Sequence, residues 1–206
     1  SDGNGAGFDG VVNVNWAHSW DTSALASNVS ASAFDFESTM THELLHAVGF
    51  ASSISQTGTD PFGGTTAGDW NPFDQYVSNN SGVLINQTTF DINQSGYTTA
   101  LTGGAGAAGL SFNGPAVLAA NGGNPLYLYS PVGYEAGSSG SHVDDQFYSG
   151  TYIMEASTST GPGNRDISAV ELALLQDIGY TNVVPEPSTG LLAFLGASLL
   201  VVRRRR

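Results

Sequence analysis

One segment of the chain, from about residue 33 to residue 48, has the period of an amphipathic α-helix. Large apolar side chains that would share one buried face recur there: Phe36, Met40, Leu44 and Val48, with Leu45 widening the stripe. Ser32 or Asp35 is placed to cap the start of this helix, and Gly49 to end it in a left-handed turn. The helix constrains the fold because its apolar stripe must pack against another layer of structure.

The same helix carries His42 and His46, four residues apart, with Glu43 beside the first histidine. Residues four apart are neighbours on a helix surface, so both imidazoles can reach one ion at about 2.0–2.1 Å. Glu43 lies on nearly the same face, where it can take a proton from a metal-activated water instead of binding the metal. These residues form the HExxH motif, which predicts a zinc site with Glu43 as the general base.

Two imidazoles do not hold a catalytic zinc, so the motif requires a third ligand. His18 and His142 are the remaining histidines, and we expect the third ligand to be His142. His142 follows a run of Gly and Ser, which would also suit a solvent-exposed loop histidine. His18 stands between Trp16 and Trp20, which favours a packing role. A gluzincin-type site would instead recruit Glu171 from a later helix, although that glutamate also fits a helix cap.

Composition restricts both the ligands and the partners. The 206-residue chain is long enough for one domain with a buried core, and it has no Cys, so any zinc must be bound through His and carboxylates. Its net charge is −13, and four of its five basic residues form the terminal run Arg203 to Arg206. Such acidity repels phosphates, which excludes nucleic acid as a partner. Calcium is a second candidate cation, although no EF-hand spacing is present.

The remaining pattern predicts short elements separated by Gly-rich and Asn-rich turns. In chain order, we expect a strand over residues 11–16, loops and short strands over 53–112, a short helix over 115–120 and a strand over 126–129. A last helix begins at a capping box formed by Ser168 and Glu171, and Gly179 is placed to end it.

The C-terminus has three parts: a Pro185-Glu186-Pro187 motif, thirteen apolar or small residues from Gly190 to Val202, and the terminal arginines. Thirteen residues fall short of the roughly 20 that span a bilayer, but a basic cluster marks a cytoplasmic stop. The tail, residues 184–206, resembles the PEP-CTERM sorting signal of Gram-negative bacteria. This resemblance implies export to the cell surface or beyond, transient anchoring in the inner membrane, and an exosortase as partner. A buried C-terminal helix is the alternative.

The body of the chain resembles the leishmanolysin-like branch of the metzincin metallopeptidases, in which HExxHxxGF precedes a long insertion, a third histidine and a Met-containing turn. The matching residues are His42, Glu43, His46, Gly49, Phe50, His142 and Met154. Ser52 stands where the more compact metzincin motif has its third histidine, so the chain departs from that pattern. Residues 112–180 also look like bacterial secreted metallopeptidases with PEP-CTERM tails, whereas residues 53–111 match only loosely.

This resemblance implies an α+β, zincin-like fold, with a twisted N-terminal sheet over the active-site helix and a loop-rich C-terminal lobe that ends in a helix. Residues 1–182 would form the catalytic domain, including the insertion at about 53–111, and residues 183–206 the sorting tail. No Met and no apolar leader precede Ser1, so we expect a processed or trimmed part of an exported precursor. Met154 would form a hydrophobic floor beneath the metal.

The expected activity is that of a zinc-dependent endopeptidase acting on protein or peptide substrates. Tyr148 or Tyr152 is placed to stabilise an oxyanion, and Asp144 or Asp145 to orient a ligand histidine as a hydrogen-bond acceptor. Two other function classes remain open. One is a non-catalytic surface or matrix protein stabilised by metal, and the other is a zinc hydrolase acting on a non-peptide amide or a cell-wall crosslink.

Overall fold

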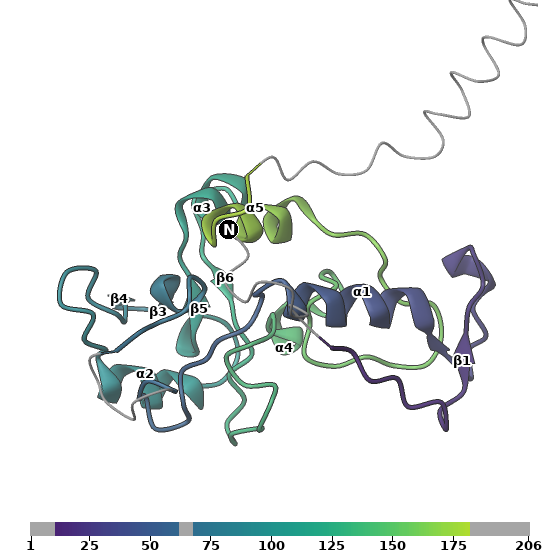
Figure 1. Cartoon of the computed structure of the whole chain (residues 1–206), viewed down its shortest axis with the longest axis horizontal. Coiled ribbons are helices and arrows are strands. Elements are labelled where there is room, and N and C mark those ends of the chain that lie inside the picture. Colours follow the sequence, from purple (N-terminus) through teal and green to yellow (C-terminus); the bar gives the residue numbers. More distant parts are fainter. Residues whose placement is uncertain (1–10, 62–67, 182–206) are drawn as a thin grey trace, which may run out of the picture.

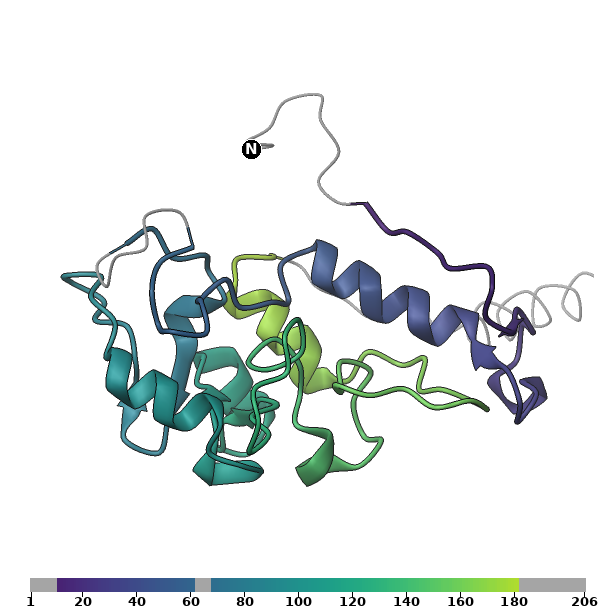
Figure 2. The same cartoon turned by 90° about the horizontal axis from the view of Figure 1, so that it is seen from below.

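The computed structural model describes residues 11–61 and 68–181, which combine helices with short strands in an α+β fold, as expected. Helix α1 (Phe36–Ala47) runs along the longest axis of the molecule, with β1 (Trp20–Asp21) at one end (Figure 1). Helix α2 (Gln94–Leu101) lies toward the other end, and the view from below shows α5 (Ala169–Asp177) between them (Figure 2). The predicted motif-bearing helix is therefore aligned with the long axis.

Of the two residues predicted to cap the start of α1, Asp35 forms the cap. The carboxylate of Asp35 accepts a hydrogen bond from the backbone N–H of Ser38 at 3.2 Å. The Ser32 hydroxyl instead lies 3.1 Å from that of Ser30. At the other end Gly49 has a φ of 101°, which confirms the left-handed turn that glycine was predicted to supply.

The predicted buried stripe of α1 is wrong at Leu44 and Val48, half-buried at Phe36 and Met40, and confirmed at Leu45. Leu44 and Val48 are 53% and 39% exposed, whereas Ser38 and Leu45 are the buried residues of the helix. Ser38 and His42 form hydrogen bonds to backbone carbonyls of the later chain, at 2.6 and 2.8 Å. These bonds fix the rotation of the helix, because buried carbonyls must find donors, and they turn the leucine at position 44 outward.

The predicted strand over residues 11–16 does not form. The side chains of residues 11–15 alternate between exposed and half-buried, as in a strand, but their backbone pairs with no strand among the described residues. Pairing begins at β1, which lies parallel to β2 (Phe34–Asp35) over two residue pairs. The twisted N-terminal sheet is therefore not found in the described part of the chain, because alternation predicts a pattern but supplies no partner strand.

The larger sheet comes from the middle of the chain, and its four antiparallel strands run in the order β4-β3-β5-β6. They are β3 (Val77–Asn79), β4 (Gly82–Val83), β5 (Ser111–Phe112) and β6 (Leu126–Tyr127). The short strands expected before residue 112 are confirmed. The strand expected over 126–129 is shorter, although Leu128 continues it through a single bridge to Val143.

Helix α2 was not predicted. Its sequence contains a glycine and two threonines, which have low helix propensity, so no local signal marks it. Tertiary burial stabilises it instead, since Tyr97 and Leu101 are each 1% exposed. The Asn93 side chain caps its first turn by accepting from the N–H of Gly96 at 3.0 Å.

Residues 53–111 supply much of the hydrophobic core and are not a peripheral addition. Buried side chains from this range include Phe73, Val77, Leu84, Tyr97 and Leu110. They join one cluster with buried residues of the helices and the later loops: Leu45, Phe112, Leu126, Met154 and Leu174. The segment that matched the metzincin pattern only loosely therefore helps to support the predicted site.

Two predicted helices are confirmed. Helix α3 (Pro115–Ala120) begins with Pro, and α5 begins at a capping box between Ser168 and Glu171. Gly179 follows α5 with a φ of 114°. The remaining short helical elements, which were not predicted, are α4 (Asp145–Tyr148) and the 3-10 helices η1 (Ala26–Asn28), η2 (Asp74–Tyr76) and η3 (Gly106–Ala108).

Within residues 11–61 and 68–181, no helix has both the length and the apolar character needed to cross a membrane. The predicted sorting tail, residues 183–206, lies outside the described residues.

Asp35 joins α1 to the later chain, and its loss should therefore destabilise the protein. Besides capping α1, its buried carboxylate forms an ion pair with Arg165 at 2.9 Å. We expect Asp35→Ala to lower the free energy of unfolding by about 3–5 kcal/mol, as when one partner of a buried pair is removed. Ser32→Ala, at the rejected cap, should change it by less than about 0.5 kcal/mol. Urea denaturation of the two variants measures this difference, and equal effects would contradict the assignment of the cap.

Candidate metal centre

The structure brings His42, His46 and His142 together. Their Nε2 atoms are separated by 3.1 Å (His46 to His42), 3.0 Å (His46 to His142) and 3.2 Å (His142 to His42). Among the described residues this is the one group of three or more His, Asp or Glu side chains that could hold a metal ion. No second cluster in that part of the chain marks a calcium site.

Backbone carbonyls orient all three imidazole rings. The Nδ1 atoms, taken in chain order of the histidines, lie 2.8 Å from the carbonyl oxygen of Ile153, 2.7 Å from that of Phe50 and 3.0 Å from that of Ser138. A carbonyl oxygen can only accept, so each Nδ1 must carry the proton. In a neutral ring the lone pair is then on Nε2, and the three lone pairs point toward one another.

The donor set fits a zinc ion. Burial lowers the pKa of His142 to about 4, and it also lowers the pKa of His46, so these rings are neutral near pH 7, as metal ligands must be. Zinc with Zn–N distances of about 2.0–2.1 Å in a tetrahedral site separates its nitrogens by about 3.3–3.4 Å. The observed Nε2 separations of 3.0–3.2 Å are close to this spacing. Three ligands leave one position of a tetrahedral site open.

His142 is held by pairing on both sides of its segment, and it is not a loop histidine in solvent. Its own carbonyl accepts from the N–H of Tyr129 at 2.8 Å, and the N–H of Val143 donates to the Met154 carbonyl at 2.7 Å. Bridges join Val143 to Leu128 and to Glu155. His142 is only 7% exposed, so the extension of β6 and the turn at Met154 together deliver it to the helix.

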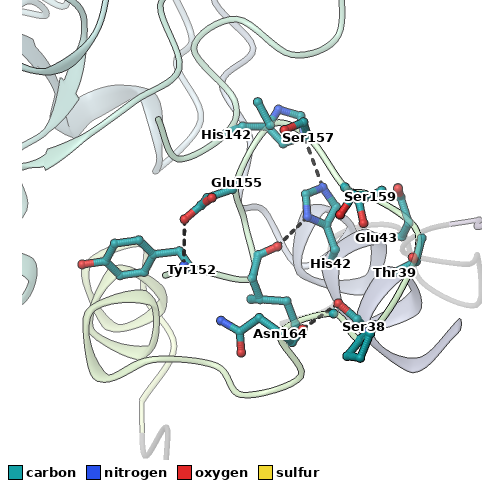
Figure 3. A pocket seen from close by; sticks show the side chains of 15 residues that line it. Ser38, Thr39, His42, Glu43, His142, Tyr152, Glu155, Ser157, Ser159 and Asn164 are labelled. Carbon is teal, nitrogen blue, oxygen red and sulfur yellow. Dashed lines mark hydrogen bonds between the residues drawn. The ribbon is translucent and has the colours of Figure 1, made fainter. Parts of the chain in front are cut away.

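A cavity of about 300 Å³ opens beside the cluster and is lined by His42, Glu43 and His142. The cavity is also lined by Tyr152 and by residues of the segment 156–164 (Figure 3). This segment is tied to α1, since the Ser38 hydroxyl donates to the Asn164 carbonyl at 2.6 Å. The exposed residue Glu43 therefore lines a polar cavity together with two of the three histidines.

Glu171 is not a fourth member of the cluster. It is fully buried, and burial raises the pKa of its carboxyl. One oxygen accepts from the N–H of Ser168 at 2.8 Å, which completes the capping box, and the other accepts from the N–H of Met154 at 2.9 Å. Glu171 therefore holds the turn that supplies the Ile153 carbonyl to His42.

His18, the rival third ligand, lies outside the cluster. It is exposed, and its ring packs edge-on against Trp20 and Phe34, as the packing interpretation predicted. Asp144 and Asp145 do not orient the ligand histidines either. Asp144 caps α4 and accepts from the N–H of Gly106, and Asp145 accepts from the Ser157 hydroxyl. Backbone carbonyls accept from the three Nδ1 atoms instead.

The two candidate tyrosines are directed elsewhere. The Tyr148 hydroxyl accepts from the backbone N–H of Tyr127 at 3.2 Å, and burial raises its pKa to about 12. Tyr152 lines the cavity, but its ring points away from His42 (Figure 3). Neither hydroxyl is directed at the cluster.

Sequence reasoning missed the groups that position the histidines. Phe50 and Ser138 each lie four residues from the histidine that they serve, so local spacing carried a signal for them. Ile153 lies 111 positions from His42, and no pattern in one sequence identifies such a contact. The same holds for the bond from Met154 to Glu171.

A comparison of the chain with protein-family models, with curated proteins and with solved structures found no match in any of the three.

Removal of His142 should abolish tight metal binding. Loss of an outer hydrogen-bond partner alone costs about 10–100-fold in metal affinity, so we expect His142→Ala to weaken zinc binding more than about 100-fold. His18→Ala, an equivalent change outside the cluster, should bind zinc as the unchanged protein does. Chelator competition measures both affinities. Equal affinity of the His142 variant and the unchanged protein would contradict the three-histidine site.

The lowered pKa of His142 should make the metal-free protein less stable in mild acid. Between the ordinary histidine pKa of about 6.5 and its folded value of about 4, the unfolded chain binds a proton on this ring and the folded protein does not. The free energy of unfolding should therefore fall as the pH drops through this window. His142→Asn should show a shallower fall, in urea denaturation with a chelator at pH 7, 5.5 and 4.5. Parallel curves would disprove the buried neutral ring.

Proposed function

We propose that this chain is a zinc-dependent endopeptidase that uses Glu43 as its general base. The observation that carries the proposal is the convergence of three imidazole Nε2 atoms within 3.2 Å of one another beside a cavity that Glu43 also lines. A site that only stabilised the fold would need no cavity and would normally be closed by a fourth protein ligand.

The chemistry divides between the metal and the chain. Zinc, when bound, would lower the pKa of a water molecule and polarise the scissile carbonyl. Glu43 takes the proton of the attacking water on its carboxylate and delivers it to the leaving amine nitrogen. It stands one residue after His42 and is exposed at the cavity, so it reaches substrate without binding the metal. His42, His46 and His142 keep their lone pairs on Nε2 through the backbone carbonyls.

The cavity supports a peptide as substrate. Its walls combine hydroxyl side chains, among them Ser38, Thr39 and Ser159, with the apolar Ile153 and Pro162, which suits a polypeptide with mixed side chains. The described residues contain one basic side chain, Arg165, and it is already paired with Asp35 and Glu37. The described part of the chain therefore offers little to bind phosphates, which argues against nucleic acid as a substrate.

The finer fold assignment, a zincin of the leishmanolysin-like metzincin branch, belongs to the same proposal. The order of the site along the chain supports it: a helix with two histidines, a long intervening segment, a third histidine and a turn containing Met154. Met154 is fully buried, and its carbonyl accepts from the N–H of Val143, the residue after His142, which supports the proposed hydrophobic floor.

Export to the cell surface or beyond, with the C-terminal tail as a PEP-CTERM signal and an exosortase as partner, completes the proposal. The support lies in the sequence of residues 184–206. An acidic, cysteine-free domain is compatible with such a location.

Replacement of the general base should separate catalysis from metal binding. We expect Glu43→Gln to lower kcat/KM by about 10²–10⁴-fold while zinc stays bound, since the amide keeps the shape but cannot take a proton. Glu37→Gln, on the same helix outside the cavity, is the matched control and should keep its activity. Cleavage of an unfolded protein substrate, with zinc content measured in parallel, gives the result.

The outcomes distinguish the other function classes. A metal-stabilised protein without catalytic activity would bind zinc and cleave neither an unfolded protein nor peptidoglycan fragments. A hydrolase of cell-wall crosslinks would cleave the peptidoglycan fragments but not the unfolded protein. It would lose its activity toward the fragments when Glu43 is replaced. Either result would overturn the peptidase proposal.

A further inference from the structure

Another buried carboxylate, Asp74, has no part in the proposed chemistry. It lies at the start of η2, it is fully buried, and burial raises its pKa. Burial of a carboxylate is costly unless donors surround it, so its contacts show what the fold gains from it.

These contacts lie in the segment that follows α1. The carboxylate of Asp74 accepts from the hydroxyls of Ser52 at 2.7 Å and Ser53 at 2.5 Å, and from the N–H of Ser53 at 3.1 Å. The Asn71 side chain bonds to the N–H of Asp74 at 2.8 Å and to the Ala51 carbonyl at 3.0 Å. Residues 51–53 are therefore fixed from one side by Asn71 and by Asp74 at the start of η2.

The other side of this segment touches the neighbour of His142. The N–H of Ser52 donates to the Ser141 hydroxyl at 3.2 Å, and that hydroxyl lies 3.4 Å from the Ser52 carbonyl. Phe50, just before the segment, supplies the carbonyl that orients His46. One stretch of four residues thus contacts the surroundings of both histidines.

We infer that Asp74 is a positioning residue for the metal centre, which it serves by fixing residues 51–53 between His46 and the loop that carries His142. This inference rests on the metal-binding part of the proposed function and does not depend on the substrate. Through Ser52 and Ser141, Asp74 sets the 3.0 Å separation between the Nε2 atoms of His46 and His142.

The chemistry of the contacts requires a carboxylate. Two hydroxyls and one N–H are directed at the side chain of Asp74 as donors. An ionised carboxylate accepts from all of them, whereas an asparagine would direct its own NH₂ group at a donor. Asp74→Asn should therefore loosen the segment although the side chain keeps its size.

Metal affinity and ligand geometry test the inference in the full chain. We expect Asp74→Asn and Ser141→Ala each to lower zinc affinity by about 10–100-fold, the range for outer partners of metal ligands. The visible absorption bands of bound Co²⁺ should shift, since they report the geometry of the ligands. Because both changes act through the same contacts, their effects in the double variant should be less than additive.

A matched control separates positioning from a loss of stability. Asp177, in α5, also accepts two backbone N–H bonds, from Ala116 and Val117 of α3 at 2.8 and 2.9 Å. These bonds join α3 to α5, and neither helix carries one of the three histidines. Asp177→Asn should lower the stability of the fold and leave the zinc affinity and the Co²⁺ spectrum unchanged.

The possible failures are distinguishable. If the unchanged protein binds no zinc, the proposed function fails first. If it binds zinc, and folded Asp74→Asn or Ser141→Ala has the same affinity and the same Co²⁺ spectrum, the positioning role is overturned. If Asp74→Asn does not fold, Ser141→Ala decides alone. That change removes only a half-buried hydroxyl between Ser52 and the loop that carries His142.

Discussion

The candidate site depends on three hydrogen bonds from imidazole Nδ1 atoms to backbone carbonyls. Each bond decides which nitrogen carries the proton, and each also fixes the angle of a ring, so the convergence of the Nε2 atoms follows from the backbone conformation. The carbonyls come from three places: the turn after α1, the loop before His142 and the turn at Ile153. Metal-ligating histidines often rely on carboxylates for this purpose, and this chain uses its carboxylates one step further out.

Without a cation, this convergence of three imidazole lone pairs is unfavourable, so other contacts of the fold must hold the rings together. Three lone pairs face one another over 3.0–3.2 Å, and burial, which lowers the pKa of His142 to about 4, makes relief by protonation costly. The backbone must therefore keep the rings together. Two buried carboxylates serve this end: Glu171 bonds to the Met154 turn, and Asp74 bonds to the segment after α1.

The sequence predicted the site better than the fold around it. The spacing of His42 and His46 and the caps at Asp35 and Ser168 are local signals, and the structure contains them because one helical turn decides each. The expected strand over residues 11–16 failed because pairing needs a partner that periodicity does not identify. The rotation of α1 about its own axis is likewise a tertiary effect. The hydrogen bonds from Ser38 and His42 to distant carbonyls stabilise it by more than the exposure of Leu44 costs.

A short-stranded, cysteine-free fold can still hold a preformed cavity because its rim is tied at several points to the residues that lead into the motif-bearing helix. The N–H of Gly161 donates to the Ala33 carbonyl at 2.8 Å, and the N–H of Gly163 donates to the Asp35 carboxylate at 3.1 Å. Arg165 bonds to the same carboxylate, so the cap of α1 and the base of the rim share one group. A rim fixed in this way would keep the cavity open without a ligand, which would reduce the conformational entropy lost on binding one. The carboxylate that starts the helix therefore also shapes the space in which Glu43 would act.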